Sequence, residues 1–283
     1  MSRLCIILCC ILLTVPAGCS VEKFLNSMVP EEGYRIVSGI AYGNDARQKL
    51  DIYIPDAPRK TTCTVVFYPG GAWNSGERAL YKFAGQAFAS QGCVAAVADY
   101  RLYPAVHYPA FVEDSALAFV WVHAHIAEYG GDPARIFLSG HSAGAYNAVM
   151  TAVHPQFLKN AGGRIEWIKG VIGIAGPYDF KPSEEEKDIR AAFSTAADAA
   201  TQPVTYVTGK FPPMLLATGE HNRRVKPRNT ASLAKKLRAA DSPVTVVSYP
   251  PASHMSIILS LVVYNREKIP LLRDIMSFID TRK

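Results

Sequence analysis

The sequence predicts one α/β domain with a mostly parallel sheet of about eight strands and helices on both faces. From about residue 34, short apolar runs alternate with helical stretches. Most runs are continuously apolar, which is typical of strands covered on both faces. No Pro/Ser-rich linker, charge run or internal repeat divides the 283 residues. We therefore expect a single domain over residues 34–283.

The sheet is expected to open with an antiparallel edge pair. Residues 34–43 (YRIVSGIAYG) and 48–55 (QKLDIYIP) alternate between apolar and polar side chains and flank a polar turn around Asn44. The central parallel strands are then predicted at six apolar runs: TVVFY, VAAVAD, RIFLSG, VIGIAG, MLLATG and VTVVSY.

Helices are predicted between these strands, and one irregular stretch interrupts the alternation. The expected helices are 78–90, 108–129, 142–153, 228–240 and a last one from about 266. Residues 181–210, with KPSEEEKD followed by small residues, predict a short cap insertion. Because functional groups of such sheets gather beyond the carboxyl ends of the strands, the candidate site is sought there.

The N-terminal segment has the pattern of a secretion signal. Arg3 precedes an apolar run from Leu4 to Val15. That run is shorter than the roughly 20 residues that span a bilayer. It fits a signal peptide over residues 1–18, so we expect the protein to be exported.

The end of this segment predicts a lipid anchor. Ala17, Gly18 and Cys19 resemble the end of a bacterial lipobox, although Pro16 replaces the usual Leu. We expect a lipidated Cys19, a tether over 19–33, and a protein anchored at the periplasmic face of a bacterial membrane. Ordinary cleavage near Ala17, which would release an unanchored product, is the alternative.

Two cysteines remain after the predicted leader and Cys19. Cys63 and Cys93 open consecutive strand-like runs, CTVVFYPGG and CVAAVADYR, and we expect them at the same end of adjacent strands. An exported protein can form a disulfide, but its geometry is strict. The sequence slightly favours two buried thiols.

The charge pattern argues against a nucleic-acid partner. The formal charge of +6 falls to +5 when a leader containing Arg3 is removed, and the positive residues are spread along the chain. No basic stripe interleaved with aromatic residues is present, so a small-molecule substrate is expected.

The motif Gly140-His141-Ser142-Ala143-Gly144 carries the strongest chemical signal. It follows the run RIFLSG and precedes a predicted helix. In this context it predicts a nucleophile elbow, in which small residues permit a sharp turn that exposes the serine. Ser142 is the candidate nucleophile.

An oxyanion hole and a base are expected at two other places. FYPGGAWNSG follows the third strand, where the backbone N–H groups of Gly71 and Ala72 can act together with that of Ala143. His254, in YPPASHMSII, lies just past the last strand, as the chain order nucleophile, acid, histidine requires. We expect His254 to be the base in preference to the other six histidines.

These motifs together resemble the α/β-hydrolase fold, in the carboxylesterase and lipase branch near hormone-sensitive lipase and bacterial feruloyl-esterase-like proteins. The matching stretches cover most of the mature chain: QKLDIYIP, YPGGAWNSGER, DYRLYPAVHYPAFVEDSALAFVWV, YGGDPARIFLSGHSAGA, GPYDF, PPMLLATGE and SYPPASH. The resemblance implies a serine carboxylic ester hydrolase without metal or organic cofactor. Asp99, Arg101 and Asp114 also match and are interpreted as scaffold ion-pair residues, whereas Pro69 departs from the His of many relatives.

The acid position departs from the family. There the acid follows the seventh strand, three residues after a glycine, and here Gly219 is followed by Glu220, His221 and Asn222. We expect Asn222 to accept a hydrogen bond from His254 Nδ1 and orient the ring. An amide cannot stabilise an imidazolium by charge, and an Asp-to-Asn change in a serine protease costs about 10⁴-fold in turnover.

Two carboxylates are alternatives to Asn222. Asp179, in GPYDF after the sixth strand, would lie one strand over and ranks second. Glu220 ranks third, because two residues of extended chain cover roughly 6.6 Å and one extra methylene cannot span that distance.

The predicted function is therefore an exported, lipid-anchored carboxylesterase. Ser142 attacks the acyl carbon, His254 transfers the proton, Asn222 orients the ring, and Gly71, Ala72 and Ala143 bind the oxyanion. An arylformamidase-like amidase, which shares the Gly-Gly-x-Trp loop, remains an alternative. So does a binding or scaffold protein built on a weakened hydrolase, because of Asn222.

Overall fold

The computed structural model describes residues 26–59 and 62–282. The predicted signal peptide and lipidated Cys19 lie outside the described residues, as does the tether up to residue 25. No helix of the described part is long and apolar enough to cross a membrane.

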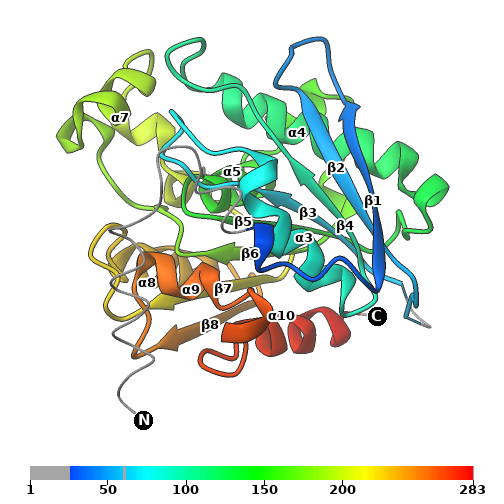
Figure 1. Cartoon of the computed structure of the whole chain (residues 1–283). Helices are drawn as coiled ribbons and strands as arrows, with labels where there is room; N and C mark the ends of the chain where they lie inside the picture. The colour runs from blue at the N-terminus through cyan, green and yellow to red at the C-terminus, as the bar shows by residue number, and fades with distance from the viewer. Residues whose placement is uncertain (1–25, 60–61, 283) are drawn as a thin grey trace, which may run out of the picture.

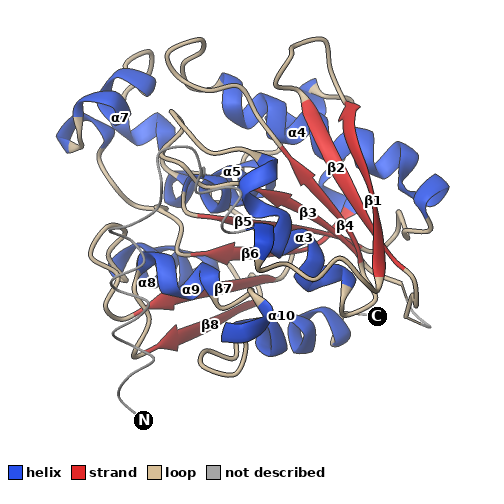
Figure 2. Cartoon of the chain, in the orientation of Figure 1, coloured by secondary structure: helices blue, strands red, loops and turns tan. Residues whose placement is uncertain are grey.

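The described chain forms one eight-stranded sheet in the order β1-β2-β4-β3-β5-β6-β7-β8, which confirms the predicted fold class (Figures 1 and 2). Strand β2 runs antiparallel to both β1 and β4, and the pairs from β4 to β8 are parallel. The strands are β1 (Tyr34–Ala41), β2 (Lys49–Pro55), β3 (Thr64–Tyr68), β4 (Val94–Ala98), β5 (Ile136–His141), β6 (Ile168–Ile174), β7 (Met214–Gly219) and β8 (Val244–Tyr249).

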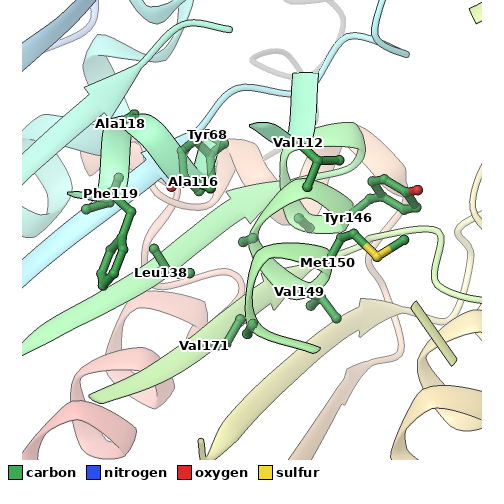
Figure 3. Packing of buried hydrophobic residues seen from close by; sticks show 14 of the residues in the cluster. Tyr68, Val112, Ala116, Ala118, Phe119, Leu138, Tyr146, Val149, Met150 and Val171 are labelled. Carbon is green, nitrogen blue, oxygen red and sulfur yellow. The ribbon is translucent and has the colours of Figure 1, made fainter. Parts of the chain in front are cut away.

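Helices cover both faces of the sheet, as Figure 2 shows. One buried cluster contains side chains of α4 (Ala110–His125), α5 (Ala143–Val153), α6 (Gln156–Asn160) and α8 (Arg228–Ala239). The other contains side chains of α3 (Lys82–Ala89), α9 (His254–Leu259) and α10 (Leu271–Asp280). Figure 3 shows the first cluster, in which Tyr146 and Met150 of α5 lie beside Val112 of α4. Because these clusters hold α5 and α9 against the sheet, they fix the positions of Ser142 and His254.

Short helical turns complete the connections. Residues 181–210, between β6 and β7, contain η4 (Pro182–Glu184), α7 (Lys187–Ala192), η5 (Asp198–Thr201) and η6 (Pro203–Thr205). Helix α7 stands away from the sheet at the top left of Figure 1. The remaining 3-10 turns are η1 (Arg78–Tyr81), η2 (Ile126–Tyr129), η3 (Ile165–Trp167) and η7 (Val263–Asn265).

The two cysteines form a disulfide, so the expectation of two buried thiols was wrong. Thr64 and Val94, the next residue after each cysteine, are directly paired in the parallel β3–β4 ladder. Cys63 and Cys93 therefore lie at the same end of adjacent strands, with Cα atoms 4.7 Å apart. This separation is within the range that a disulfide spans.

Candidate active site

Ser142 lies at the sharp turn between β5 and α5. Its backbone has φ 54° and ψ −120°, a conformation that is strained for a residue with a side chain. The turn requires glycine on its far side, since a Cβ on Gly144 would lie 1.9 Å from the Tyr68 carbonyl oxygen. The serine is thus held at the carboxyl end of β5 and at the N-terminus of α5, where free N–H groups and the helix dipole favour negative charge.

The loop after β3 supplies free backbone donors next to this serine. Gly71 has φ 140°, and a Cβ there would lie 2.1 Å from the Ser75 carbonyl oxygen. Ala72 has φ 50°, and the N–H groups of Gly71 and Ala72 bond to no acceptor within the described residues. Ala143 is the first residue of α5, so its N–H has no intrahelical partner. Gly71, Ala72 and Ser142 line one cavity.

His254, the first residue of α9, faces the serine. Its Nε2 lies 3.0 Å from Ser142 Oγ, within reach for proton transfer. Ser253 caps α9 by accepting a hydrogen bond from the backbone N–H of Ser256, which fixes the start of the helix and therefore the histidine. The sequence predicts no helix at this position, because a six-residue helix has too little periodicity to detect.

His141 positions His254 through a hydrogen bond to its backbone. The buried Nε2–H of His141 donates to the backbone carbonyl oxygen of His254 at 3.1 Å. Its Nδ1 must then be an acceptor, and it accepts a hydrogen bond from the Tyr81 hydroxyl at 3.0 Å. Burial lowers the pKa of His141 to about 3, so the ring stays neutral and this arrangement of donors is stable.

The electrostatic surroundings of His254 oppose its protonation. Burial is the main cause and the Arg224 guanidinium the second, and together they lower the pKa of His254 to about 4. Arg224 forms an exposed ion pair with Glu186, in which Arg224 Nη1 lies 3.2 Å from Glu186 Oε1. The catalytic imidazole is therefore near a cation, Arg224, that lowers its pKa, whereas in the usual triad of this fold it is near a carboxylate that raises it.

Asn222 does not form the expected hydrogen bond with His254. Its Oδ1 accepts the Val225 backbone N–H at 2.9 Å, and because an N–H can only bond the oxygen, this contact fixes the amide orientation. The remaining Asn222 Nδ2 is a donor, so it cannot accept a hydrogen bond from the Nδ1–H of His254. Within the described residues, buried Asn222 Nδ2 and His254 Nδ1 both lack a hydrogen-bond partner.

Neither alternative carboxylate contacts His254 in the described structure. Asp179 is exposed and accepts a hydrogen bond from Ser232 on α8. Glu220 is exposed and accepts from Ser248 on β8 at 3.1 Å. The acid position is thus occupied by an amide, and no carboxylate replaces it among the described residues.

Comparisons with known proteins agree with this geometry. The BD-FAE family model matches residues 50–237, from the second strand through most of α8. The chain belongs to the BD-FAE family.

Relatives of this BD-FAE chain include esterases. It is 28% identical to a probable isoprenylcysteine alpha-carbonyl methylesterase of Arabidopsis thaliana, over 78% of the chain and 51% of the relative. It is 30% identical to Esterase LipC of Mycobacterium tuberculosis, over 76% of the chain and 58% of the relative. The chain thus spans about half the length of these two proteins. The solved structure of an inhibited esterase B from Lactobacillus rhamnosis has a TM-score of 0.78 at 22% identity, covering 92% of this chain and 91% of that one, which supports the α/β-hydrolase fold.

Two adjoining cavities meet at Ser142 in this BD-FAE domain. The first, of about 680 Å³, contains His254 and is called the histidine-side cavity; its apolar lining residues are Leu80, Phe83, Met255, Ile258 and Leu259. The second, of about 510 Å³, is called the arginine-side cavity; it lacks His254 and is lined by Trp73, Ala143, Phe180, Arg223 and Lys226, among others. Ala72, Glu186, Ile189 and Arg224 line both.

Other residues singled out in the sequence have structural partners. Arg101 forms an ion pair with Asp114 at 2.7 Å, whereas Asp99 pairs with Arg78. His123 stacks on Trp167, and the ring of His154 lies against Tyr206. No group of three His, Cys, Asp or Glu side chains in the described part could hold a metal ion.

Sequence reasoning missed the contributions of His141, Tyr81 and Arg224. His141 stands beside Ser142 in the motif itself, and that adjacency was the available signal. Tyr81 is 60 residues away from His141 in the chain, and only the packing of η1 against β5 reveals the contact.

Proposed function

We propose that the protein is a carboxylic ester hydrolase with Ser142 as its nucleophile. The observation that carries this proposal is the 3.0 Å approach of Ser142 Oγ to His254 Nε2 at a strained strand-to-helix turn. Two further observations support it. The backbone N–H groups beside the serine have no acceptor in the part of the chain that the structure describes, and the chain belongs to the BD-FAE family. The small-molecule substrate is an ester, and no metal or organic cofactor enters the reaction.

The reaction proceeds through an acyl-enzyme. Ser142 Oγ attacks the carbonyl carbon while its proton passes to His254 Nε2, and the carbonyl oxygen becomes an oxyanion. The N–H groups of Gly71, Ala72 and Ala143 stabilise that charge. His254 returns the proton to the departing alcohol oxygen. Water then attacks the acyl carbon while His254 Nε2 takes a proton from it, and His254 passes that proton to Ser142 Oγ as the carboxylic acid leaves.

Proton transfer carries an unusual cost in this site. Nε2 can accept the serine proton only if the neutral ring carries its own proton on Nδ1. That N–H is buried without an acceptor among the described residues, which costs about 1–3 kcal/mol. We therefore expect turnover to be well below that of relatives with an aspartate at this position.

Labelling of the nucleophile tests the proposal. A fluorophosphonate probe should modify the wild-type protein at Ser142, as located by peptide mass, and should not modify Ser142→Ala. Parallel assays with an aryl ester and a formylated arylamine separate an esterase from an amidase. Absence of both labelling and ester hydrolysis would refute the esterase.

A catalytically weakened hydrolase that serves as a binding protein is the second candidate. The observation in its favour is that His254 Nδ1 has no hydrogen-bond partner among the described residues. The two candidates differ in one result, since a binding protein would retain an ester substrate without releasing alcohol. Ester titration calorimetry alongside an assay for the released alcohol distinguishes them.

We further propose that the protein is exported and anchored to the periplasmic face of a bacterial membrane through a lipidated Cys19. The apolar leader ending in Ala17-Gly18-Cys19 supports this, as does the Cys63–Cys93 disulfide, since disulfides persist in oxidising compartments. Mass analysis of the mature N-terminus and detergent partitioning test it. A mature protein that begins elsewhere and carries no acyl mass would contradict it.

A further inference from the structure

We propose that the two cavities bind different parts of one ester substrate. The alcohol part occupies the histidine-side cavity, and an acyl part with a terminal carboxylate occupies the arginine-side cavity. This inference rests on the esterase activity proposed above. It names the substrate class as esters between an apolar alcohol and a short acid that keeps a second, free carboxylate.

The position of His254 decides which part of the ester enters which cavity. In the tetrahedral intermediate, the carbon holds Ser142 Oγ, the oxyanion, the acyl chain and the departing alcohol oxygen. His254 Nε2 must donate a proton to that alcohol oxygen, so the alcohol part lies on the side of His254. The histidine-side cavity contains His254 and the arginine-side cavity does not. The acyl chain therefore points into the arginine-side cavity.

The walls of the arginine-side cavity match a short chain with an anionic end. The buried rings of Trp73 and Phe180 line this cavity together with Ser142. The two rings stack with centroids 5.9 Å apart and offer apolar contact to methylene groups. Arg223 and Lys226, which follow Asn222 in the chain, line the same cavity and are exposed. An acyl chain that ends in a carboxylate matches both features of this lining. Its methylene groups would contact the two rings, and its carboxylate would interact with Arg223 and Lys226.

The charge balance of this cavity leaves the two cations available. Its lining contains three basic and two acidic residues: Arg223, Arg224, Lys226, Glu185 and Glu186. Arg224 and Glu186 are paired with each other, whereas Arg223 and Lys226 form no ion pair within the described residues. Glu185 alone opposes them, so the unpaired charge of the cavity is net positive and attracts an anion.

The histidine-side cavity suits an apolar alcohol instead. Its apolar lining includes Leu80, Phe83 and three residues of α9. Its charged lining residues balance in sign, with two basic and two acidic side chains: Lys187, Arg224, Glu186 and Asp188. Met255 of α9 is 53% exposed, which is unusual for a large apolar side chain in the described part of this protein. An alkyl chain leaving Ser142 on the His254 side would cover this exposed surface.

Three esters that differ in one feature test the assignment. Hexyl hydrogen succinate carries the carboxylate on the acyl side, hexyl 4-oxopentanoate is its neutral analogue of equal length, and the pentanoate ester of 6-hydroxyhexanoic acid carries the carboxylate on the alcohol side. Release of alcohol at pH 7 and low salt gives kcat/KM for each with the full protein. We expect the first ester to exceed the other two by about tenfold, the effect of one charge-assisted contact.

Variants then locate the contact. In Arg223→Gln/Lys226→Gln the ratio of the succinate to the 4-oxopentanoate ester should fall about tenfold, and added salt should lower the same ratio in the wild type. Arg228→Gln, a matched cation outside both cavities, should leave the ratio unchanged. Equal rates for the first two esters, or a preference for the carboxylate on the alcohol side, would overturn the inference while leaving the esterase intact. Absence of turnover for all three esters together with absence of fluorophosphonate labelling would overturn both.

Discussion

His141 and His254 form a direct pair in which one histidine positions the other. The Nε2–H of His141 donates to the carbonyl oxygen of His254, and the two ring centroids lie 4.7 Å apart. The contact ties the elbow that presents Ser142 to the first residue of α9. Because no carboxylate contacts the His254 ring in the described structure, this backbone contact and the α9 cap act together with the packing of α9 in the buried cluster to hold it near the serine.

Replacing His141 should therefore lower turnover more than stability. His141→Phe keeps an aromatic ring but removes both hydrogen bonds, and we expect kcat to fall about tenfold with KM little changed, as for other losses of alignment. His141→Gln, which retains a side-chain donor, should recover part of kcat. Steady-state kinetics and thermal unfolding measured side by side test this. A purely structural role would instead lower the melting temperature and leave kcat of the folded fraction unchanged.

Restoring a carboxylate at residue 222 should raise activity. In Asn222→Asp, one carboxylate oxygen can still accept the hydrogen bond from the Val225 backbone N–H. The other can accept a hydrogen bond from His254 Nδ1–H, which has no acceptor among the described residues. We expect kcat to rise by about 10²-fold or more, since the reverse change in a serine protease costs about 10⁴-fold.

Matched variants isolate the position. Asn222→Ala should gain nothing, and Asp179→Asn should leave activity nearly unchanged because Asp179 bonds to Ser232 and not to His254. A large loss in Asp179→Asn together with no gain in Asn222→Asp would identify Asp179 as the working acid.

The sequence predicted most of the sheet well because the strands in its middle are buried on both faces. The run VTVVSY, which was expected to be a central strand, instead forms the edge strand β8, whose side chains are mostly exposed or half-buried. The run TVVFY coincides with β3 (Thr64–Tyr68), and the polar turn at residue 44 separates β1 from β2 as expected. Chain order and the elbow motif placed Ser142 and His254, which the structure brings to 3.0 Å.

The parts that failed depend on contacts between residues distant in the chain. Position relative to a glycine could place Asn222 at the acid's site, but it could not reveal that Val225 N–H binds the amide oxygen. Likewise, the pairing of Thr64 with Val94 brings Cys63 and Cys93 within bonding distance, and the sequence gives no strand register.

Loss of the disulfide should destabilise the domain without affecting catalysis. Cys63→Ala/Cys93→Ala removes a cross-link between residues 30 positions apart. The chain-entropy relation gives a loss of about 3 to 4 kcal/mol in the free energy of unfolding. The bridge lies before the first residues of β3 and β4, whereas Ser142 follows the carboxyl end of β5, so kcat/KM should be unchanged. Denaturant unfolding and ester kinetics measure the two effects. A linked peptide pair from the unreduced wild-type protein would verify the bond, and free thiols at both positions would refute it.

Hydrolysis should remain active in acid down to about pH 4. The base form of His254 is required, and burial with the nearby Arg224 lowers its pKa to about 4 from 6.5. The neutral fraction, and with it kcat/KM, should be half-maximal near pH 4 and flat above about pH 5. The direction follows from the sign of the shift, because a lowered histidine pKa keeps the base neutral at more acidic pH.

Two substitutions separate the causes of this shift. Arg224→Gln removes the cation and should move the acid limb upward, though still below 6.5 because burial is the larger cause. Asn222→Asp should move it farther upward, since a carboxylate favours the imidazolium. Arg228→Gln, whose cation is not among the causes of the His254 shift, should leave the limb in place. The pH dependence of kcat/KM for a neutral ester measures all three. A wild-type limb near 6.5 would mean that neither burial nor Arg224 lowers the pKa of His254 in solution.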